Sequence, residues 1–199
     1  MMDPIEATEV TALLQPGRPF AAPELMVLRA EGVLRQVLPG TFVCSAVEDG
    51  PAVRAAAVAT VAGPRLHESA VIGRLAAAWV HGFHPAPEVL ELLVSRFHRI
   101  PLQRGPVRLA LHECVLEPSE VQGRFAMPVT TPVRTGLDVA FHGGPAVARQ
   151  VLSRLTGPRS GGCSRQELLS AIEATGRRPG KRAAWDLVAG LPSLAAVPR

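Results

Sequence analysis

The sequence has no tyrosine, only one lysine and few aromatic residues, which make up 4% of its 199 residues. No apolar run reaches the roughly 18 residues that a membrane-spanning helix requires. Acidic residues open the N-terminus, where a secretory signal would carry a basic segment followed by an apolar stretch. The three cysteines are widely spaced and odd in number, which disfavours a disulfide framework. Together these absences predict a cytoplasmic protein.

Hydrophobic residues are plentiful, at 47% of the chain with a mean hydropathy of +0.20. This content is ample for a buried core and excludes global disorder. The length allows one large domain or two small ones, and it excludes a multi-domain enzyme.

Positive charge is concentrated in the C-terminal part. Of the 21 cationic residues, all but Lys181 are arginines. Residues 1–120 carry a net charge of −3, whereas residues 121–199 carry a net charge of +7. A basic C-terminal part favours an acidic partner, either nucleic acid or the acidic face of a protein. Scattered, solvated arginines are the alternative interpretation.

The N-terminal pattern indicates a small winged-helix-like module over residues 1–47. Capping residues and a proline predict a helix from residue 3 to about residue 15, and a second helix is expected over residues 22–31. Pro39 and Gly40 have the signature of a type II turn between two β-prone runs. We therefore expect a hairpin formed by residues 33–37 and 42–44.

A polar break at residues 48–51 predicts the boundary of a second domain, over residues 51–199. Its hydrophobic periodicity predicts helices at residues 52–61 and 69–81, then strands at residues 89–94, 107–114 and 127–130. Pro132 opens a further helix, which is followed by three more helices. A capping box at Ser164 and Glu167 begins one of them, and the last is expected over residues 181–189. The predicted fold class is mixed α/β (α+β) with a helical C-terminal tail.

The sequence nominates no catalytic, cofactor-binding or metal-binding residues. The two His-containing clusters, near His81 and His112, lack the paired close spacing of zinc ligands. The basic segment at residues 176–182 has the wrong glycine spacing for a phosphate loop, and it lacks the Ser or Thr that would hold magnesium. No nucleophile elbow or dinucleotide fingerprint is present. Carboxylates that meet only in space remain an alternative, and they would make the protein a nuclease or a transferase.

Four cations in one predicted loop are the best candidate contacts for nucleic acid or another acidic partner: Arg177, Arg178, Lys181 and Arg182. A solvated loop is the alternative. Arg35 in the hairpin is a further candidate contact. Arg134 and Asp138 stand four residues apart and can pair on one helix face, where we interpret them as a structural clamp. Trp79 is predicted to lie in the core of the second domain.

Three segments of the sequence carry a resemblance to a known family. Residues 31–43 (EGVLRQVLPGTFV), 76–82 (AAAWVHG) and 129–140 (VTTPVRTGLDVA) are similar, in this order, to motifs of the AbiEi family. This family comprises the abortive-infection antitoxins of type IV toxin–antitoxin systems. The matched region extends from about Gly32 to Ala140.

The resemblance implies an N-terminal winged helix that binds promoter DNA. It also implies a C-terminal domain that counters a nucleotidyltransferase-like toxin. Only two helices fit before residue 33, so the module is shortened. The net charge of −2 over residues 1–45 argues against strong DNA binding by this module. The sequence thus predicts a non-enzymatic, antitoxin-like regulator whose binding maps to the C-terminal part. An interaction module without a toxin partner and an enzyme are the alternatives.

Overall fold

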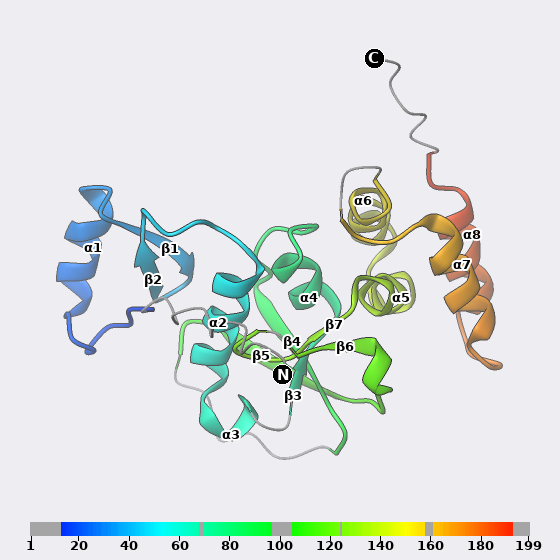
Figure 1. The fold of residues 1–199 in the computed structure, drawn as a ribbon, viewed down its shortest axis with the longest axis horizontal. Helices are drawn as coiled ribbons and strands as arrows, with labels where there is room; N and C mark the ends of the chain where they lie inside the picture. The colour runs from blue at the N-terminus through cyan, green and yellow to red at the C-terminus, as the bar shows by residue number, and fades with distance from the viewer. Residues whose placement is uncertain (1–12, 68–69, 97–104, 124, 158–160, 193–199) are drawn as a thin grey trace, which may run out of the picture.

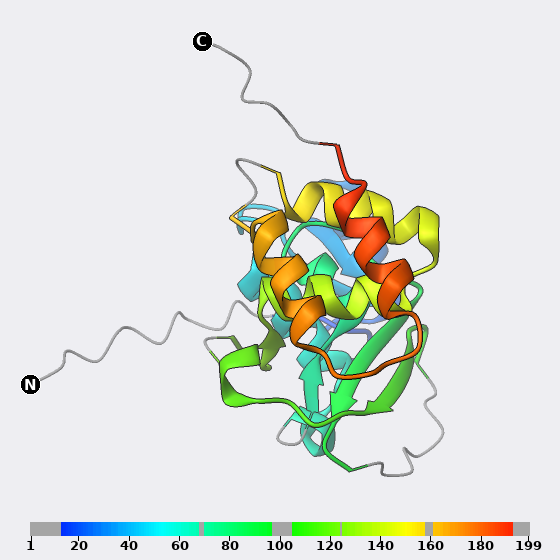
Figure 2. The same ribbon diagram turned by 90° about the vertical axis from the view of Figure 1, so that its right-hand side faces the viewer.

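A computed structural model describes residues 13–67, 70–96, 105–123, 125–157 and 161–192 of the chain. It has the mixed α/β fold that the sequence predicts (Figures 1 and 2). In Figure 1 a helix and hairpin lie on the left, a five-stranded sheet lies in the centre, and a group of helices lies on the right. None of the helices in the described part of the chain has the length and apolar character needed to cross a bilayer.

The N-terminal unit consists of one helix and a two-stranded antiparallel sheet: α1 (Ala22–Ala30), β1 (Leu34–Leu38) and β2 (Thr41–Cys44). Gly40 has a φ of +71°, the left-handed conformation that the Pro39-Gly40 turn requires. Leu25, Leu34 and Phe42 form a small core of their own. The predicted helix at 22–31 and the predicted hairpin are therefore confirmed.

The first predicted helix is wrong where the structure tests it. Residues 1–12 lie outside the described residues, but residues 13–15 are extended. The amide and carbonyl of Leu14 both bond to Phe42, at 2.9 Å each. Pairing with β2 satisfies the backbone that a helix would have satisfied. The predicted domain boundary falls between β2 and the next helix, although Leu38 of β1 also packs into the core of the large sheet.

The large sheet is mixed, with the strand order β5-β4-β3-β7-β6. Strands β3 and β4 pair antiparallel, as do β6 and β7, while β4 pairs parallel with β5 and β3 parallel with β7. Its strands are β3 (Ala70–Ile72), β4 (Val89–Val94), β5 (Arg108–Glu113), β6 (Val121–Gln122) and β7 (Val129–Thr130). The predicted strands at residues 89–94, 107–114 and 127–130 are confirmed. The first and last strands of this sheet along the chain, β3 and β7, are therefore neighbours in it.

The predicted helix at residues 69–81 is wrong in its first half. Residues 70–72 form β3, and the helix α4 (Arg74–Val80) begins only afterwards. Neighbouring strands take the backbone bonds, because Ile72 donates to Pro128 at 2.8 Å and Gly73 donates to Glu91 at 3.1 Å. A Cβ at Gly73 would lie 2.5 Å from the Leu93 side chain, so β4 passes closely against this turn. Tertiary pairing thus overrides the helical periodicity.

The remaining helices divide between two hydrophobic cores. One core lies around the sheet and includes α2 (Pro51–Ala62), next to the short helix α3 (Pro64–His67). The other lies among four helices, α5 (Pro132–His142), α6 (Pro145–Leu155), α7 (Arg165–Ala174) and α8 (Lys181–Ala189). Figure 2 shows these four helices facing the viewer, above the sheet and partly in front of it. The predicted starts of α5, α7 and α8 are confirmed, including the capping box of Ser164 and Glu167.

Helix α4 belongs to both cores. Its residues Ala76, Ala77, Trp79 and Val80 are part of the core around the sheet, whereas Ala78 belongs to the helical core. Small side chains allow the close approach on both sides. The predicted burial of Trp79 is confirmed, since only 6% of the residue is exposed.

Candidate functional site

The basic segment at residues 177–182 lies at the turn between α7 and α8. It lines an open groove of about 920 Å³ together with the first turns of α8. The lining residues include all four of the cations that the sequence singles out, and also Trp185 and Asp186. We call this the α8 groove. The four predicted contact residues are therefore brought together on one surface, although their side chains differ in what they already bind.

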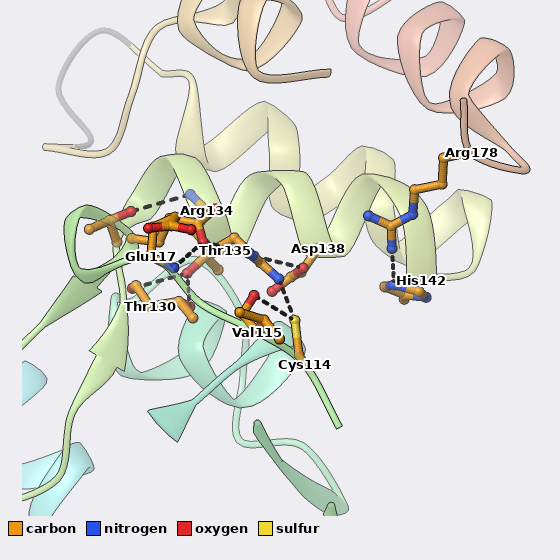
Figure 3. Close-up of polar contacts among 11 residues, drawn as sticks. Cys114, Val115, Glu117, Thr130, Arg134, Thr135, Asp138, His142 and Arg178 are labelled. Atoms are coloured by element: carbon orange, nitrogen blue, oxygen red, sulfur yellow. Dashed lines mark hydrogen bonds and ion pairs between the residues drawn. The ribbon is translucent and has the colours of Figure 1, made fainter. Parts of the chain in front are cut away.

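Arg178 is positioned by α5. Its guanidinium carbon lies 4.1 Å from the centroid of the Phe141 ring, and its Nη2 donates to His142 Nε2 at 2.8 Å (Figure 3). His142 can accept this bond only as a neutral imidazole. Burial, reinforced by the charges of Arg74 and Arg178, lowers the pKa of His142 to about 4. The imidazole is therefore neutral near pH 7 and holds Arg178 at the edge of the α8 groove.

Lys181 has a structural role in this turn. Its ammonium donates to the carbonyl of Glu173 at 2.8 Å and also to the carbonyl of Thr175. These carbonyls lie at the end of α7, so the lysine satisfies groups that the helix leaves without partners. Lys181 is thus less available to a partner than the sequence alone suggests.

Arg182 and Arg177 project into solvent. Arg182 has a side chain that is 86% exposed, pairs with Asp186 at 3.0 Å and lies over the Trp185 ring at 5.7 Å from its centroid. Exposed pairs of this kind contribute about 0–1 kcal/mol, so the arginine can change partners at little cost. Arg177 is exposed and has no hydrogen-bond or ion-pair partner among the described residues. Three arginines, and not four cations, are therefore available on this surface.

Arg35 lies elsewhere, on β1 of the N-terminal unit. Its side chain is 27% exposed, pairs with Asp49 at 3.6 Å and donates to the carbonyl of Val47 at 3.4 Å. Arg54 binds the same carboxylate at 2.7 Å, and this bond lowers the pKa of Asp49. The structure does not bring Arg35 to the α8 groove, and it places the side chain within a local ion-pair network.

Arg134 and Asp138 pair on α5 as the sequence predicts, at 3.1 Å. Arg134 also donates to Glu120 at 2.8 Å and to the sulfur of Cys114 at 2.9 Å, which joins α5 to the segment after β5 (Figure 3). The sequence did not reveal these two additional partners. Attraction to Asp138 and Glu120 outweighs the effect of burial and raises the pKa of Arg134.

Asp138 is the most buried charged side chain of this network, with 4% of it exposed. Its Oδ1 accepts from Arg134, but its Oδ2 has no partner among the described residues. Burial raises the pKa of Asp138, against the attraction of Arg134, Arg74 and Arg178. Its charged neighbours are thus arginines, which is the arrangement of a clamp.

A second polar cluster, which the sequence did not nominate, lies on β4, β5 and α4. Arg74 Nη1 lies 3.1 Å from both Glu91 Oε1 and His112 Nε2, and His112 also lies 3.1 Å from that oxygen. Burial and the charge of Arg74 lower the pKa of His112. The only sequence signal was that Glu91 and His112 interrupt two apolar strands. In the described ranges, no three His, Cys, Asp or Glu side chains are grouped so as to hold a metal ion.

Two of the segments that resemble the AbiEi motifs meet in the structure. His81, at the end of α4, donates from Nε2 to the carbonyl of Thr130 at 2.7 Å, just before α5. The hydroxyls of Thr130 and Thr135 lie 2.7 Å apart and are buried, and Thr131 caps α5. The residues of these two motifs therefore build the junction between α4, β7 and α5.

Comparisons with known proteins identify no family for this chain. No protein-family model matches the sequence, and no curated protein matches it. Among solved structures, the chain is similar to the crystal structure of the RV2827C protein from Mycobacterium tuberculosis, with 17% identity and a TM-score of 0.41. The similarity covers 85% of this chain and 63% of that chain, so this chain spans less than two thirds of RV2827C. The likeness concerns the arrangement of the backbone alone.

Proposed function

We propose that this protein is a non-enzymatic, antitoxin-like regulator of a type IV toxin–antitoxin system, and that it binds nucleic acid through the α8 groove. A nucleotidyltransferase-like toxin would be its second partner. The observation that carries the binding proposal is the set of three solvent-facing arginines around one open groove: Arg177, Arg178 and Arg182.

Arginine suits a phosphate backbone because its planar guanidinium donates two parallel hydrogen bonds and keeps its charge at any physiological pH. The net charge of +7 over residues 121–199 supports attraction of a polyanion over a longer range. Phosphate contacts of this kind would give affinity and position but little sequence discrimination.

The polar clusters support a non-enzymatic role. Asp138 and Glu91 are the least exposed carboxylates of the two polar clusters, and each is paired with an arginine at 3.1 Å. A carboxylate bound to an arginine in this way is typical of a structural ion pair. General acid–base catalysis would instead need two carboxylates that exchange protons with a substrate. The resemblance to AbiEi antitoxins supports the regulatory class, because its motifs coincide with the framework of the fold.

Binding to labelled DNA across a series of salt concentrations tests this proposal. The first variant replaces Arg177, Arg178 and Arg182 by glutamine, and Lys181 is kept because it caps α7. The matched control makes the same charge change on the N-terminal unit, at Arg18, Arg29 and Arg35. Each phosphate contact contributes about 0.9 to the slope of log affinity against log salt. We expect the groove variant to lose roughly 2–3 from the slope and the control to keep it.

The opposite result would refute the assignment to the groove. If the control variant loses DNA binding while the groove variant binds as the unmodified protein does, the shortened winged helix is the DNA-binding element. Thermal unfolding should show that both variants are folded. Five of the six arginines are exposed, and Arg54 still binds Asp49 when Arg35 is replaced.

A further inference from the structure

The α8 groove combines two features that need not occur together. Arginines surround it, and an aromatic ring lines it, because Trp185 is only partly buried against the helical core. A groove for phosphates alone needs no indole. Among the described residues, Ala183 is the other apolar side chain that lines this groove, and Arg182 lies above the indole ring at 5.7 Å from the ring centroid.

From this combination we infer that the α8 groove binds single-stranded nucleic acid, with phosphates on Arg177 and Arg178 and one base stacked on Trp185. The inference rests on the proposed function and specifies the class of nucleic acid that is bound. A base has a flat aromatic face that an indole can stack on. The face of Trp185 below Arg182 becomes available to a base when that exposed guanidinium turns away from the ring. Phosphates joined to the same strand reach the arginines beside it.

A duplex fits this surface less well. Bases in a duplex are already stacked on each other, so Trp185 could not reach a base face without unpairing it. Recognition of a duplex by a helix places a run of side chains along the major groove. On α8, however, the cations lie in the first turn, and the acidic Asp186 follows Arg182 by one turn.

Asp186 is the one acidic side chain that lines the groove in the part of the chain that the structure describes. It opposes a phosphate beside it, and it holds Arg182 in an ion pair at 3.0 Å. Both partners are exposed, at 86% and 52%, so solvent screens the pair and Arg182 can turn toward a phosphate. Arg178 needs no such change, because Phe141 and His142 already hold it at the groove.

The test measures fluorescence anisotropy of a labelled oligothymidylate with the full-length protein. Two matched probes accompany it: an abasic oligomer with the same number of phosphates, and poly-L-glutamate as a competitor. Replacing Trp185 by leucine keeps an apolar side chain against the helical core but removes the stacking surface. Because stacking of a base contributes about 1–3 kcal/mol, this variant should bind oligothymidylate about 5- to 150-fold more weakly.

Three further measurements separate stacking from charge. Binding of the abasic oligomer should be weaker than that of oligothymidylate, and Trp185→Leu should not change it. Trp185→Phe should restore part of the lost affinity. Oligothymidylate should also quench tryptophan fluorescence in the unmodified protein, and this quenching should vanish in Trp185→Phe because Trp79 is buried.

Equal binding of oligothymidylate and the abasic oligomer would refute stacking but leave the proposed nucleic-acid binding intact. Competition by poly-L-glutamate at matched charge, with no quenching by oligothymidylate, would identify an acidic protein as the partner and refute the inference. If no nucleic acid binds at all, the proposed function itself fails. If Trp185→Leu does not fold, the affinity of Trp185→Phe and the quenching measurement still show whether a base stacks on Trp185.

Discussion

The two tryptophans of this protein each have an arginine beside them, but their surroundings differ. Trp79 is buried on α4, and its carbonyl accepts from Arg54 at 2.9 Å. Arg54 also binds Asp49 through two nitrogens, so its donors are already engaged. Trp185 instead lines the open α8 groove, and the Arg182 above it is 86% exposed. Trp79 and Arg54 thus belong to the framework, by which we mean the two cores and the buried polar contacts that join their elements, whereas Trp185 and Arg182 face solvent.

The difference shows why residue type alone does not define a binding surface. The arginines of the framework, such as Arg54 and Arg134, are surrounded by carboxylates and carbonyls that bind them. At the α8 groove, Asp186 is the carboxylate that pairs with an arginine among the described residues, and that pair is exposed. A ligand can therefore gain new bonds at the groove without first breaking buried ones.

The tryptophans provide the largest predicted contrast. We expect Trp79→Ala to lower the free energy of unfolding by about 3–5 kcal/mol, because the change leaves a cavity in the core around the sheet. Trp185→Ala removes a side chain that is only partly buried, and its effect should be clearly smaller. Chemical denaturation followed by circular dichroism measures both. Equal effects would show that Trp185 is as much a part of the framework as Trp79.

The arginines provide the next contrast. Arg134→Met would leave Asp138 buried and without its ion-pair partner, and breaking such a pair costs about 3 kcal/mol or more. Arg182→Met removes an exposed pair and should cost about 0–1 kcal/mol. The same denaturation experiment compares the two variants. If Arg134→Met is as stable as Arg182→Met, the contacts of Arg134 do not clamp α5 to the segment after β5.

The smallest predicted effect is a dependence of stability on pH. The pKa of His142 falls from 6.5 in the unfolded chain to about 4 in the fold. Between these values the unfolded chain binds more protons, so the contribution of His142 to stability is present above pH 6.5 and is lost as the pH falls toward 4. Burial lowers the pKa of His81 in the same direction.

The variant His142→Gln isolates this contribution. Glutamine remains neutral and can still accept from Arg178, so the variant should lose less stability between pH 6.5 and pH 4 than the unmodified protein. The comparison is needed because the raised pKa of Asp138 acts in the opposite direction in both proteins. Thermal unfolding at several pH values gives the result, and parallel curves for the two proteins would contradict the assigned role of His142.

Local sequence signals were sufficient to predict an element where two residues close in the sequence determine the backbone conformation. Pro132 with its Thr131 cap, Ser164 with Glu167, and the Pro39-Gly40 turn each specify a start or a reversal through their own geometry. The elements at these residues agree with the prediction. The clustering of the basic residues was also predictable, because they are adjacent in the sequence.

Long-range contacts were not predictable in this way. Strand β3 has only three residues, and it is a strand because β4 and β7 lie on either side of it. Arg74 has a φ of +50° and follows the close approach at Gly73, and the hydrophobic pattern of the sequence predicted neither feature. Likewise, no spacing could show that Lys181 would bind the carbonyls of α7, or that Arg134 would reach Glu120 and Cys114.

The position of helix α4 between the two cores has a consequence for how the protein unfolds. Four of its seven residues lie in the core around the sheet, and Ala78 lies in the core among α5–α8. Losing α4 would expose apolar surface in both cores at once, so the sheet and the four helices should unfold cooperatively. The α8 groove lies at the outer side of this cooperative body. A ligand bound there would therefore stabilise the sheet against unfolding without touching it.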